Sequence, residues 1–321
     1  MSEWFDLVKK SETIALFTHI NSDGDANGSV MAMYHTLKNL GKDVYVFIPT
    51  PINRSYWFTG SNKISCKRKL KSYDLAIALD CPNTKRFGQC ETEFFKAKHS
   101  ICIDHHLENA NFADITFVDT DISSASELLW SLLEKEGDVK ITKEIVTCLY
   151  LGIATDTGGF THGSHGDINS KTWRAVANLT DFGADLNAVN YNIFNLTRKP
   201  VFELLKFSLA NVEFYENGKI AMVCVPKRFL EEVGAELTDT HKFTDLLSGV
   251  EGVEIFAVMA GKAQNEQSVS VRSQKHSAQR ICKSFGGGGH LKAAGCRLFV
   301  PFEVGKKQLL DECVRELYRN D

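Results

Sequence analysis

The sequence contains no pair of cysteines at CxxC spacing and no long apolar run, and each absence excludes a class of protein. Its nine cysteines are scattered along the chain, which argues against a structural zinc site and favours free thiols in a reducing compartment. No apolar run approaches the ~18 residues that a membrane-spanning helix needs, and Met1 to Trp4 do not open a secretory leader. We therefore predict a cytoplasmic protein without a membrane segment.

The sequence also lacks an excess of basic residues. Its formal net charge is −3 and its pI is about 6.4, so we expect no broad basic surface for long nucleic acids. Short anionic ligands bound at a local site remain compatible with this charge. The length of 321 residues indicates two domains, and the 43% hydrophobic content is ordinary for a globular protein.

The pattern of apolar runs and helical periodicity predicts an α/β fold. We expect an N-terminal domain, 1–196, with a mostly parallel sheet flanked by helices. A helical linker at 197–215 and a smaller C-terminal α/β domain at 216–321 would follow. The expected strands are 13–18, 43–48, 74–80, 100–104, 220–225, 253–259, 267–272 and 296–299. The expected helices are 4–10, 26–40, 123–136, 141–154, 169–182, 200–212, 240–248, 276–285 and 302–318.

The stretch Thr18–Asp25 lies between the first predicted strand and the first long helix. It places one imidazole and two carboxylates, His19, Asp23 and Asp25, within seven residues. In an open α/β sheet this turn lies at the carboxyl edge of the strands, where ligands bind. Taken alone, the stretch is equally compatible with an ordinary helix N-cap at Asp25.

Three further segments repeat this design, because each ends an apolar run with polar residues. All four segments should therefore meet at one edge of the sheet. The residues that they deliver are His19, Asp23, Asp25, Asp80, Asp104, His105, His106 and Asp156. Carboxylates gathered in this way would repel one another, and divalent cations would remove the conflict. Carboxylate-rich sites with some imidazole favour manganese or magnesium.

The motifs Thr18–Asp25, Asp80, Asp104–His106 and Asp156–Gly158 resemble the four motifs of the DHH phosphoesterase superfamily. In the second half, Ser270–Ser273 and Gly286–Gly295 are similar to the DHHA1 domain. The resemblance covers nearly the whole chain, with its motifs in the family's order. It implies the short, two-domain DHH–DHHA1 architecture.

The resemblance also implies roles for individual residues. Two divalent cations would be bound, most readily Mn²⁺, with Mg²⁺ or Co²⁺ as alternatives. His19 and Asp23 would bind one cation, Asp25, His105 and Asp156 would bind the other, and Asp80 would contact both. Asp104 would support the site and His106 would face the scissile phosphate. A water activated by the cations would attack phosphorus.

The second domain is expected to hold the substrate. Glycine N–H groups at Gly287, Gly288 and Gly289 would face an anion, and His290, Arg272 and Ser273 would add hydrogen bonds to a terminal phosphate. The alternative for the glycine run is a flexible linker. Arg86 is a weaker candidate for a phosphate contact, and His162 and His165 have no assigned role.

These expectations converge on hydrolysis of short oligoribonucleotides and dinucleotides to mononucleotides, and of 3′-phosphoadenosine 5′-phosphate (pAp) to AMP. Within the same chemistry, the alternatives are a phosphodiesterase for dinucleotide messengers and a RecJ-like single-strand exonuclease. Other classes left open are an inorganic pyrophosphatase or polyphosphatase and a non-catalytic nucleotide-binding protein. The resemblance also implies a homodimer.

Overall fold

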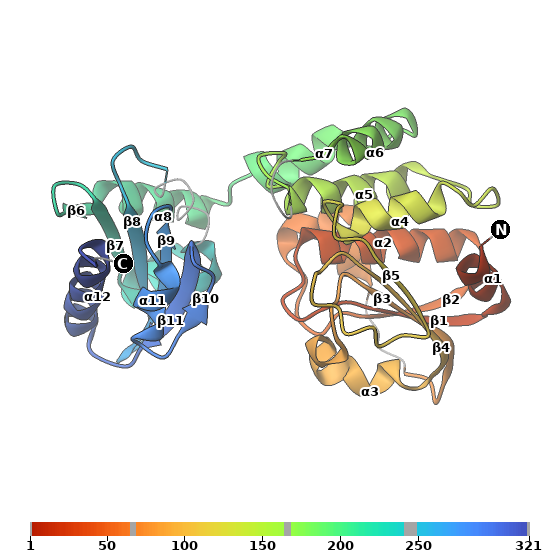
Figure 1. The fold of residues 1–321 in the computed structure, drawn as a ribbon, viewed down its shortest axis with the longest axis horizontal. Helices are drawn as coiled ribbons and strands as arrows, with labels where there is room; N and C mark the ends of the chain where they lie inside the picture. The colour runs from red at the N-terminus through yellow and green to blue at the C-terminus, as the bar shows by residue number, and fades with distance from the viewer. Residues whose placement is uncertain (1, 65–68, 164–167, 241–248, 320–321) are drawn as a thin grey trace. The chain divides into compact units, whose positions relative to one another are not determined.

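The computed structural model describes residues 2–64, 69–163, 168–240 and 249–319. The chain divides into two compact units, residues 1–196 and 197–321, and each is considered by itself (Figure 1). Within the described ranges, no helix combines the length and hydrophobicity that crossing a membrane would require.

The first unit is built on a parallel sheet with the strand order β2-β1-β3-β4-β5. Every neighbouring pair in this sheet is parallel, which confirms the predicted sheet type. The strands are β1 (Thr13–Phe17), β2 (Asp43–Phe47), β3 (Tyr73–Leu79), β4 (Ala97–Asp104) and β5 (Ile115–Val118). The carboxyl-terminal parts of the central strands are apolar because both of their faces are buried there, whereas the first residues of β4 are polar and exposed.

Helices cover the two faces of this sheet. Those against the sheet are α1 (Glu3–Lys10), α2 (Gly24–Asn39), α3 (Glu91–Phe94), α4 (Ala125–Leu133) and α5 (Lys143–Asp156). Two further helices, α6 (Ser170–Asp181) and α7 (Leu186–Asn190), pack against α5. The larger core lies between the sheet and α2, α4 and α5, and a smaller aromatic core around Phe17, Phe87 and Phe94 fills the opposite face.

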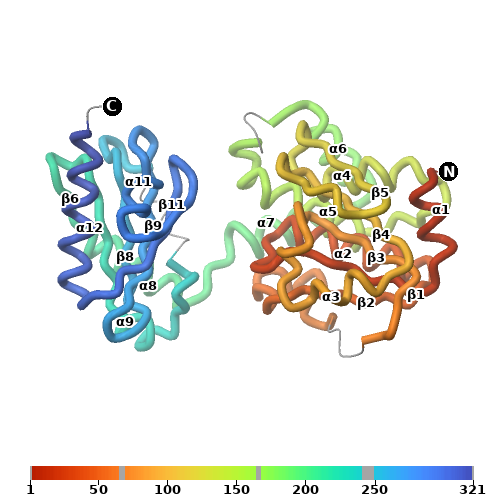
Figure 2. The backbone as a smooth tube through the Cα atoms, turned by 60° about the horizontal axis from the view of Figure 1, so that its bottom comes forward, coloured from red at the N-terminus to blue at the C-terminus, as the bar shows by residue number. Residues whose placement is uncertain are grey.

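Helices α2 and α5 run side by side although more than a hundred residues separate them (Figures 1 and 2). Glycine allows this close approach: a Cβ atom on Gly28 would lie 2.5 Å from the carbonyl oxygen of Cys148. The start of α2 carries Asp25 and the end of α5 carries Asp156. Tight packing of the two helices therefore positions two of the predicted metal ligands.

The second unit contains a mixed sheet with the order β10-β11-β9-β8-β7-β6. Only the β7–β8 pair is parallel among its described strands. Its strands are β6 (Glu213–Tyr215), β7 (Ile220–Val225), β8 (Ile255–Ala263), β9 (Glu266–Ser273), β10 (Gly288–Gly289) and β11 (Ala293–Leu298). Its helices are α8 (Lys199–Ala210), α9 (Lys227–Val233), α11 (Ala278–Lys283) and α12 (Phe302–Leu317).

Several elements differ from the sequence prediction. The segment 197–215, expected as a linker, contributes α8 and β6 to the second unit, and Leu204 of α8 is buried in a core with residues of β7 and β8. The short elements β5, α7, β6 and α9 were not predicted. The expected helix at 240–248 falls almost entirely on residues outside the described ranges.

Candidate active site

The site lies where parallel strands of the first unit end. His19 follows β1, Asp80 follows β3, and His105 and His106 follow β4. Asp80 has a φ of 53°, in the left-handed region that few residues other than glycine adopt. A strained backbone at this position is typical of a functional site, and it directs the Asp80 side chain into the cluster.

Asp80 lies between two groups of potential ligands. In the first group, His19 Nε2 is 3.4 Å from Asp80 Oδ2 and 3.7 Å from Asp23 Oδ2. The potential ligand atoms of this group all lie within 4.8 Å of one another. His19 is nearly fully buried, whereas Asp23 is exposed. This group therefore has a solvent-facing side.

The second group surrounds His105. Its Nε2 atom lies 3.2 Å from Asp156 Oδ2, 3.9 Å from Asp25 Oδ2 and 3.6 Å from Asp80 Oδ1. Asp25, His105 and Asp156 again offer ligand atoms within 4.8 Å of one another. The structure thus brings together all six side chains predicted from the sequence as metal ligands.

The residues present fit divalent cations. Among the described residues, Asp80 Oδ1 and His105 Nδ1 are buried polar atoms without a hydrogen-bond partner. A buried carboxylate oxygen left unpaired is costly unless a ligand completes its environment. The donor set, carboxylates with imidazole nitrogens, is one that suits hard divalent cations.

The pKa values show how strongly these groups interact. Burial lowers the pKa of His19, but Asp23 and Asp80 outweigh burial and raise it to about 10. Burial likewise opposes protonation of His105, whereas Asp80, Asp25 and Asp156 raise its pKa to about 10. Burial and the Asp25 carboxylate raise the pKa of Asp156. Without cations, protons on His19 and His105 therefore offset the negative charge of the neighbouring carboxylates.

Asp25 is fixed by the start of α4. Its Oδ2 accepts a hydrogen bond of 2.7 Å from the backbone N–H of Ala125, and its Oδ1 accepts one of 2.9 Å from Ser126. Two N–H groups at a helix N-terminus stabilise a carboxylate. Ser124 caps this helix, because its Oγ accepts a hydrogen bond from the N–H of Glu127.

His106 is oriented by a buried carboxylate. Its Nδ1 lies 2.7 Å from Asp104 Oδ1, and Asp104 is fully buried. An ionised carboxylate only accepts hydrogen bonds, so Nδ1 of His106 must carry the proton. The other oxygen of Asp104 accepts a hydrogen bond of 2.6 Å from Asn109 Nδ2. Asn109 was not predicted from the sequence, because an asparagine in a loop is typical of an ordinary turn.

Arg86 lies against the first ligand group. Its Nη2 atom is 3.1 Å from His19 Nδ1, while the carbonyl oxygen of Ile20 lies 2.7 Å from the same nitrogen. If Nδ1 donates to Ile20, Nε2 is left unprotonated as a ligand. Arg86 then contacts His19 without a hydrogen bond, because both groups are donors. Its guanidinium remains partly exposed beside the site.

In the second unit, Arg272 lies on β9 opposite Ala293, and the backbone of Ala293 pairs with that of His290. Arg272 is partly exposed and His290 is exposed. Ser273 differs from expectation: it is buried, its hydroxyl donates to the carbonyl oxygen of Glu254, and it accepts a hydrogen bond from the N–H of His276. We therefore remove Ser273 from the substrate-contacting set.

The glycine run is part of the sheet rather than a flexible linker. Gly288 and Gly289 form β10. The N–H of Gly287 donates to the carbonyl oxygen of Cys282, so this group is not available to an anion as predicted. A Cβ atom on Gly287 would lie 2.3 Å from the carbonyl oxygen of Gly295, and Gly289 has a φ of 139°. Packing and backbone conformation thus require these two glycines.

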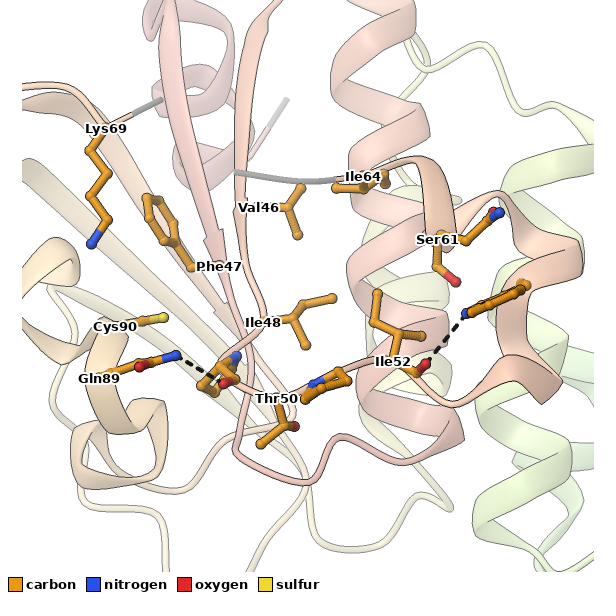
Figure 3. A pocket seen from close by; sticks show the side chains of 14 residues that line it. Val46, Phe47, Ile48, Thr50, Ile52, Ser61, Ile64, Lys69, Gln89 and Cys90 are labelled. Carbon is orange, nitrogen blue, oxygen red and sulfur yellow. Dashed lines mark hydrogen bonds between the residues drawn. The ribbon is translucent and has the colours of Figure 1, made fainter. Parts of the chain in front are cut away.

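A cavity of about 680 Å³ lies beside β2 and contains none of the predicted site residues (Figure 3). Its lining combines apolar side chains, among them Val46, Ile48, Ile52 and Ile64, with polar ones such as Thr50, Ser61, Lys69 and Gln89. It adjoins the loop that carries His19 only indirectly, through the hydrogen bond from the N–H of Asn21 to Thr50 Oγ1. The chemistry of the cluster therefore identifies the site better than cavity size does.

His162 and His165 are given no role in the site. His162 is exposed, after the loop that follows Asp156. His165 lies outside the described residues.

A parallel sheet that gathers histidines and aspartates at its carboxyl edge, followed by a second sheet unit, is the architecture expected of DHH phosphoesterases. The chain matches the family model described as "DHH family, N-terminal domain" over residues 13–153. It belongs to this family, as its motifs predicted.

Its relatives extend over both units. The chain is 31% identical over 286 residues to the "Bifunctional oligoribonuclease and PAP phosphatase NrnA" of Thermus thermophilus. The aligned region covers 89% of this chain and 84% of the relative. The Bacillus subtilis protein of the same name is 24% identical, with 90% of each chain covered. The crystal structure of an exopolyphosphatase-related protein from Bacteroides fragilis superposes with a TM-score of 0.84 at 26% identity, covering 97% of this chain and 94% of that one.

Proposed function

We propose that this chain is a hydrolase that cleaves short oligoribonucleotides and dinucleotides to mononucleotides and removes the 3′-phosphate of pAp. The observation that carries the proposal is the pair of ligand groups that meet at Asp80. The similarity to oligoribonuclease and PAP phosphatase relatives over nearly the whole chain supports the same substrates.

The proposed ligands are those that the two groups supply: His19, Asp23 and Asp80 for one cation, and Asp25, His105, Asp156 and Asp80 for the other. Mn²⁺ is the proposed ion. Bound there, two divalent cations would lower the pKa of water and offset charge on the phosphoryl oxygens. Proton donation and phosphate binding are assigned to side chains of the protein.

His106 is the proposed catalytic residue of the protein. Asp104 accepts a hydrogen bond from Nδ1–H, so the imidazole presents Nε2 away from the buried carboxylate. About a third of the His106 side chain is exposed, so a substrate can contact it. When it carries a proton, Nε2 can donate a hydrogen bond to a phosphoryl oxygen and can give that proton to the leaving alcohol. Asp104 and Asn109 are positioning residues for this imidazole.

Arg86, Arg272 and His290 are the proposed phosphate-binding residues. Arg86 lies beside the ligand group of His19, where an arginine can make charge-assisted hydrogen bonds to a phosphate. Arg272 and His290 belong to the second unit, where Ala293 is opposite Arg272 and its backbone pairs with that of His290, and this proximity suits recognition of one terminal phosphate. A few local contacts of this kind need no broad basic surface.

Hydrolysis of a substrate panel tests the proposal. Purified protein would be incubated with Mn²⁺ and one substrate at a time. The substrates are pApA, pAp, a 24-nucleotide RNA and pyrophosphate. Rapid release of mononucleotides from pApA and of phosphate from pAp, with slow turnover of the long RNA, is expected. Faster turnover of pyrophosphate than of pApA would overturn the proposal in favour of a pyrophosphatase, and equal turnover of the long RNA would favour an exonuclease of long strands.

A further inference from the structure

One face of the second sheet is unusual because only part of it is covered by helices. On this face, Phe256, Val258 and Ala260 of β8 are buried in a core with α8 and α9. In the part of the chain that the structure describes, that core includes no residue of β9 or β11. The neighbouring strands therefore present an open surface on the same face.

The open surface combines small residues with two arginines. On β9, Ser268, Ser270 and Arg272 alternate with buried residues, so they share one face. On β11, Ala293, Gly295 and Arg297 alternate in the same way. The register pairs Gly295 with Ser270, which in turn pairs with Val258 of the covered half. We call this surface, with Gly288 of β10, the glycine–serine face.

Gly288 of this face has no packing requirement in the fold, and Gly295 is restricted by one backbone contact. Gly288 and Gly295 are directly opposite one another across β10 and β11, and neither has a positive φ. A Cβ atom on Gly288 would meet nothing within 4 Å, and one on Gly295 would meet only the carbonyl oxygen of Val269, at 3.3 Å. A glycine inside a strand that packing does not need marks a place where a ligand approaches the backbone closely.

A cavity confirms that the face is hollowed. It has a volume of about 460 Å³, and its lining includes Ser268, Ser270, Gly295, Arg297 and Phe299. Phe299 is 71% exposed, which is unusual for a large aromatic side chain that contacts no core. Among the described residues, Arg297 forms an exposed ion pair of 3.5 Å with Glu266, and such pairs contribute little energy.

Two arginines mark the ends of the face. Arg272 is opposite Ala293, and Arg297 is opposite Ser268. The two positions are four residues apart along the strands, or roughly 13 Å. One nucleotide contacts only one of these ends, whereas a chain of several nucleotides spans both. Phosphates suit the arginines and the serine hydroxyls, and an exposed aromatic ring is the usual platform for a nucleobase.

We propose that the glycine–serine face binds the nucleotides of an oligonucleotide substrate that lie beyond the one whose phosphate contacts Arg272. Arg297 would bind a second backbone phosphate and Phe299 would stack on a base. The flat floor at Gly288 and Gly295 would let the sugar–phosphate backbone lie against the strands. This inference rests on the proposed function and extends it, because it makes the face a determinant of substrate length.

Kinetics with two substrates of different length test the inference. The substrates would be pAp, which is too short to reach Arg297 from Arg272, and a 5′-phosphorylated RNA pentamer. The variants are Arg297→Gln and Phe299→Ala. Their matched controls are Arg315→Gln, which removes another exposed, ion-paired arginine from α12, and Phe214→Ala, which removes another exposed phenylalanine from β6 at the opposite edge of the sheet.

The expected result is a shift in substrate preference. The ratio of kcat/KM for the pentamer to kcat/KM for pAp should fall about tenfold in both variants, through KM, and should keep the wild-type value in both controls. An unchanged ratio would overturn the inference, and so would an equal loss on both substrates, because the residues would then serve the terminal nucleotide or the fold.

A binding measurement keeps the test independent of catalysis. In EDTA, fluorescence polarisation of a labelled pentamer should show weaker binding to Arg297→Gln, Phe299→Ala and Gly295→Val, with thermal unfolding confirming that each variant is folded. If the wild type hydrolyses neither substrate, the proposed function fails, but this measurement still decides the role of the face. If tripolyphosphate displaces the labelled pentamer as effectively as unlabelled pentamer does, recognition of nucleotides by the glycine–serine face is overturned.

Discussion

A Cβ atom on Gly152 would lie 2.4 Å from Oδ1 of Asp25. The same atom would lie 2.0 Å from Oγ of Ser126, whose N–H binds that carboxylate. Gly152 of α5 is therefore a glycine because the carboxylate of Asp25 and the start of α4 occupy the space where a side chain would be. The geometry of the second ligand group depends on this close packing.

Replacing Gly152 by alanine should damage the metal site as well as the fold. The extra methyl group must displace Asp25 or Ser126, and overpacking of this kind costs about 1–3 kcal/mol. We expect Gly152→Ala to lower the melting temperature and to weaken Mn²⁺ binding about tenfold or more, as measured by calorimetric titration. Gly137→Ala is the control, because its Cβ atom would meet nothing within 4 Å. Wild-type Mn²⁺ affinity in Gly152→Ala would contradict this account of Asp25.

The contact between Asp104 and His106 should affect turnover more than metal binding. In Asp104→Asn, the imidazole loses the anionic acceptor of its Nδ1 proton. We expect kcat to fall about a hundredfold, in the range of general acid–base contributions, with Mn²⁺ affinity changed by less than about threefold. A loss of Mn²⁺ binding that accounts for the whole loss of activity would instead make Asp104 a metal ligand.

Arg86 should act on the substrate rather than on the cations. A charge-assisted hydrogen bond contributes about 1.5–3 kcal/mol, so Arg86→Gln should raise KM for pAp and for pApA by roughly tenfold or more. Its neighbour Lys85 is exposed, and Lys85→Gln serves as the control for the lost charge. An unchanged KM in Arg86→Gln would assign this arginine to the support of His19 alone.

Binding of cations should release protons. His19 and His105 have pKa values raised to about 10, above the ordinary value of 6.5, so both rings are protonated at pH 7.5 without cations. Their nitrogens must lose protons to bind a cation. Mn²⁺ affinity should therefore increase as the pH rises from 6.5 toward 10. Titration calorimetry in two buffers of different ionisation enthalpy should show release of about one proton or more per cation, and identical heats in both buffers would contradict this.

The catalytic unit could be predicted from the sequence to a large extent because its signals are local. Each central parallel strand ends in an apolar run, and the polar residue that follows this run, such as Asp80 or His105, is the functional one. What could not be predicted depends on contacts across the fold. Asn109 gains its role only through Asp104, and Gly152 gains its role only through Asp25, 127 positions earlier in the printed sequence.

The second unit was harder to predict for a different reason. Its short edge strand β6 and the seven-residue helix α9 bury too few residues to produce a clear period. The sequence does not distinguish the residues of the glycine run from one another. In the structure a side chain at Gly287 would clash with its neighbours, whereas one at Gly288 would contact nothing within 4 Å. Ser273 likewise belongs to a motif, but its hydroxyl serves the fold.

The most direct test of the central claim is a comparison of wild type with Asp80→Asn. Asparagine keeps the shape of the side chain and tolerates the left-handed backbone at this position, so the protein should remain folded. We expect wild type to hydrolyse pApA and pAp only with added divalent cation, and Asp80→Asn to lose about a thousandfold or more in kcat/KM together with tight Mn²⁺ binding. Hydrolysis of pApA by a folded Asp80→Asn at the wild-type rate, or by the wild type in EDTA, would contradict the account.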